Sequence, residues 1–301
     1  MNRCVHPADT YVVADSARVP RREWRAELAL RYQHRGSRTI VSDARHFGPL
    51  RVQRAFYPEA DGTCHSYLLH PPGGMAVGDQ LAIQVRAEAQ SRVLLTTPSA
   101  GKMYGTMGIA NAEQMPQQQT VLLHADEGAS LEWLPQETIV FNAAQARLQT
   151  RIYLHPRANC IAWDILRLGR AASRDPFLEG RCRQHIALYR DNQLVFNELT
   201  HLDAGTPLQT AAWGLQGRNT LATLLVTGIF YRDEIDALME YLQTQCSAEG
   251  LWGLTQKNDV LIARYLGNSI MQCRAGLRFL WQAARRRLFE KEAIAPRIWL
   301  T

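Results

Sequence analysis

The stretch WRAELALRY, Trp24–Tyr32, shows the pattern from which the fold can be predicted. Every second residue in it is apolar, and the residues between them are mostly charged. A period of two is typical of a β-strand that buries one face and exposes the other. This segment therefore predicts a strand that lies against an apolar core.

Short runs of the same kind follow along the next 170 or so residues, with turn-forming residues between them. Pro71–Gly74 (PPGG) is a chain break, and Asp191–Asn192 predicts a tight hairpin turn because Asp and Asn tolerate positive φ. Further strands are predicted at Leu50–Arg54, His65–His70, Gln80–Ala87, Val93–Thr97, Thr120–Ala125, Ser130–Leu134, Thr138–Phe141, Ala146–Leu154, Cys160–Arg167, His185–Tyr189 and Leu194–Leu199. Many short strands without helices between them predict a mainly β protein, a single large body of β-helix or sandwich type.

The last third of the chain predicts two α-helices instead. Asp233–Gln245 has an apolar stripe at helical spacing, and Asp233 is a candidate cap. Asn268–Phe289 has a longer stripe, and its opposite side is expected to be basic. The residues assigned to that basic side are Arg274, Arg278, Gln282 and Arg285. This helix either packs on the core with a solvated basic face or docks on a partner. The predicted organisation is a flexible arm over residues 1–20 and one domain over residues 21–301, β-rich to about residue 230 and helical beyond it.

Composition narrows the class of protein. The 301 residues are 46% hydrophobic, which suffices for a packed core, and the formal charge is +6. This charge is dispersed, so acidic protein partners explain it better than nucleic acid does. The longest apolar stretch, Leu221–Phe230, is far shorter than the roughly 20 residues that span a bilayer. The six cysteines include no C-x-x-C pair, and residues 1–15 lack a signal-peptide pattern. We therefore expect a cytoplasmic protein with reduced thiols that binds neither nucleic acid nor membrane.

The sequence lacks recognisable catalytic machinery. Gly101–Lys102 resembles the end of a phosphate-binding loop, but Thr96 replaces the first glycine and Met103 replaces the hydroxyl that would bind magnesium. Neither a G-x-S-x-G elbow nor an H-E-x-x-H motif occurs. The sequence therefore predicts a protein that is not an enzyme and holds no cofactor tightly.

Carboxylates in apolar surroundings are the most unusual feature. Leu131–Phe141 (LEWLPQETIVF) places Glu132, Gln136 and Glu137 among large apolar residues, and Asp164 lies in a similar run. An unpaired buried charge is costly, so these groups need partners or water. One explanation is a structural salt bridge, for instance from Lys102 or Arg170. The other is a polar, hydrated passage through the β body.

A second polar region holds side chains that can bind a transition metal. Cys64, His65, His70 and Asp79 lie close together in the sequence, and thiolates and imidazoles are suitable donors for such ions, nickel included. His65 and His70 are five residues apart, so on one strand they would point to opposite faces and could not chelate together. Packed structural histidines are the alternative explanation.

Several long strings together resemble the UreD/UreH family of urease accessory proteins. They follow the family's order along the chain. They are GPLRVQRAFYPE (Gly48–Glu59), CHSYLLHPPGG (Cys64–Gly74), LLTTPSAGKMY (Leu94–Tyr104), LEWLPQETIVF (Leu131–Phe141), AWDILRLGR (Ala162–Arg170) and the terminal PRIWLT (Pro296–Thr301).

The resemblance implies a non-enzymatic, mainly β protein that associates with UreF and the GTPase UreG and docks on apo-urease to promote nickel insertion. It also implies an internal passage for nickel in transit. The side chains assigned to that passage are Asp79, Glu132, Glu137 and Asp164, with His65, His70 and Cys64 as secondary candidates and Thr96, Thr97, Gln136 and Lys102 as polar support. The alternative function is a pure assembly scaffold that holds urease open without conducting nickel.

Overall fold

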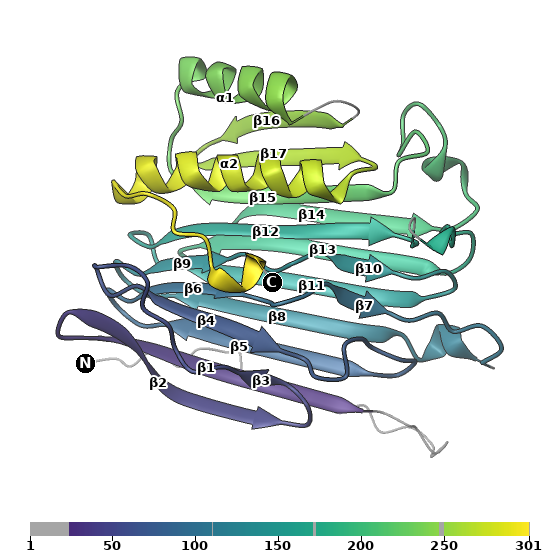
Figure 1. The fold of residues 1–301 in the computed structure, drawn as a ribbon, viewed down its shortest axis with the longest axis horizontal. Helices are drawn as coiled ribbons and strands as arrows, with labels where there is room; N and C mark the ends of the chain where they lie inside the picture. The colour runs from purple at the N-terminus through teal and green to yellow at the C-terminus, as the bar shows by residue number, and fades with distance from the viewer. Residues whose placement is uncertain (1–23, 110, 171–172, 247–249, 301) are drawn as a thin grey trace.

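The computed structural model describes residues 24–109, 111–170, 173–246 and 250–300. The predicted arm, residues 1–20, lies outside the described residues. Two sheets form the body (Figure 1). In spatial order the seven-stranded sheet contains β14 (Gln193–Asp203), β13 (Arg181–Arg190), β11 (Gln145–Leu154), β8 (Gln117–Ala125), β5 (Gln80–Ala87), β1 (Arg25–Arg35) and β2 (Arg38–Phe47).

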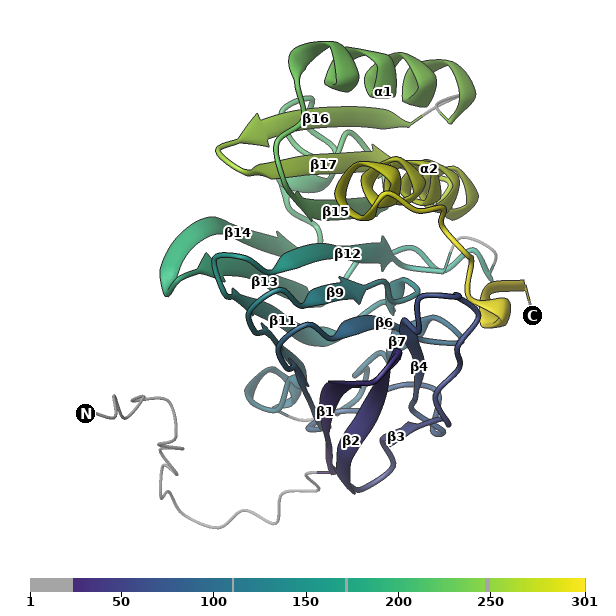
Figure 2. The same ribbon diagram turned by 90° about the vertical axis from the view of Figure 1, so that its left-hand side faces the viewer.

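The ten-stranded sheet lies against the first and carries both helices (Figure 2). Its main path contains β16 (Leu251–Lys257), β17 (Val260–Gly267), β15 (Thr220–Thr227), β12 (Asn159–Leu168), β9 (Ser130–Trp133), β6 (Arg92–Thr96), β4 (Cys64–Leu69) and β3 (Arg51–Val52), and β10 (Thr138–Val140) joins β12 to β7 (Gly101–Met103). The helices are α1 (Arg232–Gln245) and α2 (Ile270–Phe289), and short 3₁₀ helices occur at Ala112–Gln114, Pro207–Gln209 and Arg297–Leu300.

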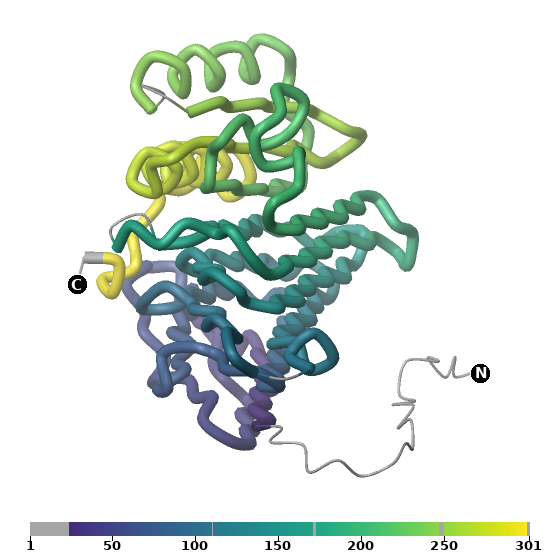
Figure 3. Tube along the Cα trace, turned by 90° about the vertical axis from the view of Figure 1, so that its right-hand side faces the viewer, coloured from purple at the N-terminus to yellow at the C-terminus, as the bar shows by residue number. Residues whose placement is uncertain are grey.

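The chain winds between the two sheets as a parallel coil (Figure 3). Between β4 and β13 the chain passes repeatedly from one sheet to the other, with β6 and β7, and also β9 and β10, following each other in the ten-stranded sheet. Within each sheet these strands pair in parallel, as β5 does with β8 and β6 does with β9. The apolar side chains that alternate along each strand fill the space between the sheets, from Leu28 of β1 to Leu188 of β13. The predicted mainly β architecture of β-helix or sandwich type with two C-terminal helices is therefore confirmed.

The C-terminal third also contains strands that the sequence analysis did not identify. β16 and β17 form a hairpin between the two helices, and β15 is the apolar run that was noted only for its length. The predicted hairpin at Asp191–Asn192 is present, with φ of 51° and 60° at the two residues. The expectation that Asp233 caps α1 was wrong. The residue at the N-cap position is Tyr231. The backbone N–H of Tyr231 donates a hydrogen bond to the Glu234 carboxylate at 2.7 Å.

A glycine at the start of β13 gives a prediction about stability. Gly180 has φ of +98°, and an added Cβ would lie 2.4 Å from the backbone oxygen of Ala144. Gly73 has φ of +76°, but an added Cβ would meet nothing within 4 Å. Left-handed backbone costs an L-residue about 1–2 kcal/mol at either position, and only Gly180→Ala adds a backbone clash. Denaturant titration should show Gly180→Ala at least about 1 kcal/mol less stable than Gly73→Ala. Equal losses would contradict this packing.

Candidate functional site

Helix α2 packs along the ten-stranded sheet on the side away from the inter-sheet core (Figure 2). The hydroxyl of Ser269 caps its first turn by accepting a hydrogen bond from the Gln272 N–H at 3.2 Å. Leu277, Leu280 and Trp281 are buried in a second apolar cluster, which includes Trp163 from β12. The sheet therefore has apolar residues on both faces, and its outward apolar face is covered by α2.

One arginine of α2 is buried in the interface between α2 and the ten-stranded sheet, which we call the α2 seam. Arg285 is 0% exposed and lies between two carboxylates. Its Nη2 donates to Glu59 Oε1 and to Glu132 Oε1, each at 2.7 Å. Its Nη1 donates to Glu59 Oε2 at 3.1 Å, and its Nε donates to Glu132 Oε2 at 2.9 Å. The expectation that Arg285 lies on a solvated basic face was wrong, because a position eight residues after Leu277 falls on the apolar stripe of the helix.

Other groups complete this buried ionic cluster, which we define as Glu59, His65, Glu132, Trp281, Arg285 and Lys291. His65 is buried, and its Nε2 lies 2.7 Å from Glu59 Oε1. The Trp281 indole N–H donates to Glu132 Oε2 at 2.5 Å. The Lys291 ammonium lies 3.1 Å from Glu59 Oε2. Arg285 thus binds both Glu59 and Glu132, which are nearly inaccessible to solvent, and Lys291 is shared between Glu59 and the partly exposed Asp61, from which it lies 2.7 Å.

The pKa values follow from these contacts. Burial alone would raise the pKa of Glu59, but hydrogen bonds from His65 and Arg285 outweigh it and hold that pKa well below its usual range. Burial alone would lower the pKa of Arg285, but Glu132 and Glu59 outweigh it and raise that pKa. Glu59 and Arg285 are therefore both ionised, and removal of either one would leave an uncompensated buried charge.

The contacts of Glu132 favour one of the two explanations of this buried carboxylate, the structural salt bridge. Its oxygens accept hydrogen bonds from Arg285 and Trp281, which occupy the roughly four lone-pair sites of a carboxylate. A structural salt bridge is present, but its partner is neither Lys102 nor Arg170. Arg170 pairs with Asp175 instead, at 2.9 Å.

The other residues of the LEWLPQETIVF string lie further along the same seam. Glu137 is buried and forms an ion pair with Arg274 of α2, which is about one third exposed. The Gln136 N–H donates to Thr97 Oγ1 at 2.9 Å. Thr96 Oγ1 donates to the Leu134 carbonyl and accepts from the Trp299 indole at 2.8 Å. These contacts fasten the C-terminal segment to strands β6, β9 and β10.

Asp79 and His70 form a separate pair at the turn before β5. The Asp79 carboxylate accepts from the Ala76 N–H at 2.7 Å, and burial raises its pKa. Burial also lowers the pKa of His70, although the nearby Asp79 charge opposes this shift. Cys64 is buried toward the inter-sheet core, and burial raises its pKa. Lys102 lies on β7 beside Ile139, and no ion pair joins it to Glu132 or Glu137 in the described chain.

Asp164 lies in a third place, between the two sheets. Its Oδ2 accepts from Thr150 Oγ1 of β11 at 2.8 Å. It lines a small cavity of about 10 Å³ with Trp133, Ile186 and Thr223, close to the least space that holds one water molecule. Burial raises the pKa of Asp164 to about 6, and the charge of Glu198 contributes to this shift.

This shift predicts a pH dependence. Because the pKa of Asp164 is higher in the folded protein than its ordinary 3.8, folding takes up a proton between these values. The contribution of Asp164 to stability is thus fully present below about pH 4 and is lost as the pH rises through about 6. Asp164→Asn keeps an acceptor for Thr150 and removes the titration. Its free energy of unfolding should rise relative to wild type by about 2 kcal/mol between pH 4 and pH 7 in denaturant titrations. A constant difference would contradict the assignment.

The structure therefore places most of the predicted site residues in three regions: the α2 seam, the Asp79–His70 turn and the interior around Asp164. Cys64 lies in the inter-sheet core and Lys102 lies on β7. Within the described residues no group of three or more His, Cys, Asp or Glu side chains is arranged to hold a metal ion. No described helix combines the length and apolarity needed to cross a bilayer. Sequence reasoning missed Glu59, Trp281 and the buried role of Arg285. The sequence signal that could have revealed them was the position of Arg285 on the apolar stripe of α2, where a buried cation needs a carboxylate partner.

Comparison with known proteins gives a consistent result. The family model described as UreD urease accessory protein matches residues 25–300. A protein named urease accessory protein UreD from Saccharophagus degradans is 48% identical over 283 residues, which are 94% of this chain and 95% of that protein. Proteins of the same name from Pseudomonas fluorescens and Dechloromonas aromatica are 43% and 41% identical, each over 92% of this chain and 95% of the relative.

Proposed function

Since the chain belongs to the UreD family of urease accessory proteins, we propose that it assists the insertion of nickel into apo-urease. The observation that carries this proposal is the family match across nearly the whole described chain, from residue 25 to residue 300. A role in urease maturation follows from the family itself. Nickel delivery, assembly with UreF and UreG, cytoplasmic location and the absence of catalysis by this chain are the further content of the proposal.

In this proposal nickel is cargo, held weakly and released. A conduit needs donors with free lone pairs, and oxygen and imidazole ligands meet that need. Glu132 is a poor candidate because its oxygens are occupied by Arg285 and Trp281. Asp79, with His70 close by, and Asp164 have fewer partners. These three side chains are the ones we propose to contact nickel in transit.

The acceptor sites of the Glu132 carboxylate are all occupied by hydrogen bonds, and this also favours a second candidate function. A buried ionic cluster that fixes α2 gives a rigid body without needing a metal route. The chain would then act as an assembly scaffold that holds urease open while nickel arrives by another path. The two functions differ in what they require of Asp79 and His70.

Complementation tests both. Cells that express urease and its other accessory proteins without this chain should yield inactive enzyme, and the wild-type chain should restore activity and co-purify with UreF, UreG and urease. Asp79→Ala with His70→Ala should keep co-purification but reduce activation if nickel passes there. Asp43→Ala, at a 41% exposed carboxylate on β2, is the matched control. Full activation by the double variant would leave the scaffold function, and full activation without the chain would exclude both.

A further inference from the structure

The outward face of the seven-stranded sheet has neither of the two α-helices packed on it. Its strands β1, β5, β8, β11 and β13 run parallel, and their inward side chains fill the core. Parallel sheets are usually covered on both faces. Here both helices pack on the ten-stranded sheet instead (Figures 1 and 2). We call the outward-pointing side chains of β5, β8, β11 and β13 the open face.

An aromatic row crosses the open face. His124, Tyr153 and Tyr189 occupy matched register positions on β8, β11 and β13. Their rings are stacked, with centroids 4.8 Å and 4.9 Å apart and interplanar angles of 10°. Such rigid, partly polar rings are enriched in protein interfaces, because they offer contact area at little cost in conformational entropy.

The open face also carries positive charge that no described carboxylate neutralises. Arg86 and Arg183 have carboxylate partners, Asp126 and Asp203. Arg147 and Arg151 on β11 have no ion-pair partner among the described side chains, and the Nε of Arg151 is buried without a hydrogen bond. Arginine is the usual cation of protein interfaces, because its planar fork binds carboxylates bidentately.

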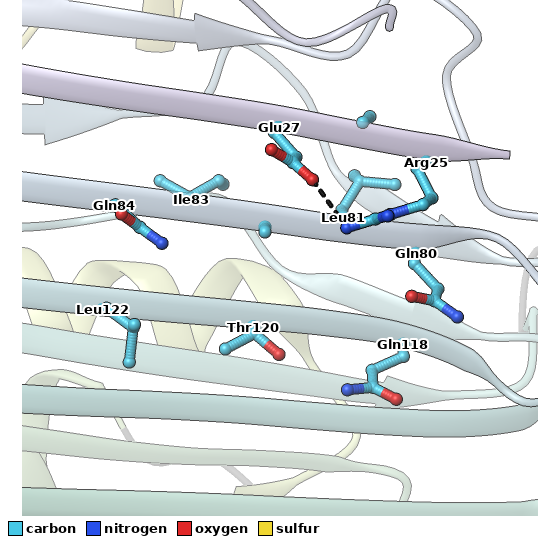
Figure 4. A pocket seen from close by; sticks show the side chains of 11 residues that line it. Arg25, Glu27, Gln80, Leu81, Ile83, Gln84, Gln118, Thr120 and Leu122 are labelled. Carbon is cyan, nitrogen blue, oxygen red and sulfur yellow. Dashed lines mark hydrogen bonds and ion pairs between the residues drawn. The ribbon is translucent and has the colours of Figure 1, made fainter. Parts of the chain in front are cut away.

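A hollow lies beside this charge, between β1, β5 and β8 (Figure 4). Its volume is about 150 Å³, and its lining includes Ala82, whose short side chain lies between Gln80 and Gln84 on the same face of β5. Gln118 and Thr120 complete a rim of uncharged hydrogen-bonding groups. A side chain of a partner could enter there without meeting an uncompensated charge, because Glu27 already binds Arg25 at 2.9 Å.

We propose that the open face is the docking surface for a flat, acidic protein surface, and that apo-urease supplies it. The identity of the partner rests on the proposed function. We choose an acidic protein surface as the occupant because of charge complementarity. The unpaired arginines can bind carboxylates of a folded protein, and the aromatic rings and amides beside them can contact its neighbouring side chains. A nucleic acid would require a row of cations along its phosphates, and only Arg147 and Arg151 are unpaired on β11.

The test is binding of the purified full-length chain to purified apo-urease at low and moderate salt. Arg147→Glu should weaken binding about tenfold at low salt, and its affinity should change less with salt than that of wild type. Adding Arg151→Gln should weaken binding further. Arg54→Glu is the matched control. Arg54 is exposed, follows strand β3 of the ten-stranded sheet, and forms no ion pair in the described chain. The control should bind like wild type.

The outcomes are distinct. Equal binding by Arg147→Glu and wild type would overturn the docking surface while leaving the proposed function intact. Equal losses in Arg147→Glu and Arg54→Glu would overturn it as well, because the effect would be one of net charge. Displacement of apo-urease by a DNA duplex, or self-association of the chain through Arg147, would assign the face to a different occupant. Failure of the wild-type chain to bind apo-urease would remove the proposed function and this inference together.

Discussion

Arg285→Met is expected to lower the free energy of unfolding by about 3–5 kcal/mol, the usual loss when one partner of a buried ion pair is removed. The variant removes the cation that lies between Glu59 and Glu132, while Lys291 and His65 still contact Glu59 and the Trp281 indole still donates to Glu132. The pKa of Glu59, which Arg285 holds below its usual range, must then rise, so the loss should be larger at pH 8 than at pH 5. Denaturant titration of the purified chain at both pH values measures it.

Two variants make this prediction specific. Arg286→Met changes the next residue, which is exposed and pairs with the exposed Glu292, so it should change stability little. Arg285→Met combined with Glu59→Gln and Glu132→Gln removes all three charges and should recover part of the loss, because uncharged groups are less costly to bury. If Arg285→Met and Arg286→Met are equally stable, Arg285 is not buried between the carboxylates.

Glu132→Ala is expected to cost about 3 kcal/mol or more in unfolding free energy. It removes the acceptor of the Trp281 indole N–H and half of the charge that neutralises Arg285. Glu137→Ala should cost about 1 kcal/mol or less, because its partner Arg274 is about one third exposed and can reach water. The same denaturant titration compares them.

This pair of variants matters for how loss of urease activation is interpreted. If the Glu132→Ala variant fails to activate urease and also unfolds more easily, its lost stability explains the result, and no role of Glu132 in the nickel route follows. A chain with Glu137→Ala that stays folded yet fails to activate urease would implicate that carboxylate in the nickel route. Equal stability of the two variants would contradict the different surroundings that the structure gives them.

The β body could be predicted from the sequence because alternation in short segments is a local signal. The runs at Gln80–Ala87 and Cys160–Arg167 coincide with β5 and β12 almost residue for residue. The hairpin β16–β17 was missed because the helical segments on both sides dominated the pattern there. In β17, Val260 to Ala263 is a continuous apolar run, which strands and buried helix segments share.

The site could be predicted only in part, for a different physical reason. The sequence correctly indicated that Glu132 and Glu137 lie in apolar surroundings and need partners. The partners are 153 and 137 residues away, on a helix that reaches the sheet only in the folded chain. Spacing within a segment carries no information about such contacts. The position of Arg285 on the apolar stripe of α2 was the one local sign that a buried carboxylate existed elsewhere.

The most direct test of the central claim is the nickel content of urease. Urease should be purified from cells that hold the other accessory proteins, with the wild-type chain, without it, and with Arg286→Met as a folded control. Nickel per active site should be measured beside activity. We predict nickel-loaded, active urease with the wild-type chain and the control, and metal-poor, inactive urease without the chain. Equal nickel content with and without the chain would contradict the claim that it assists nickel insertion.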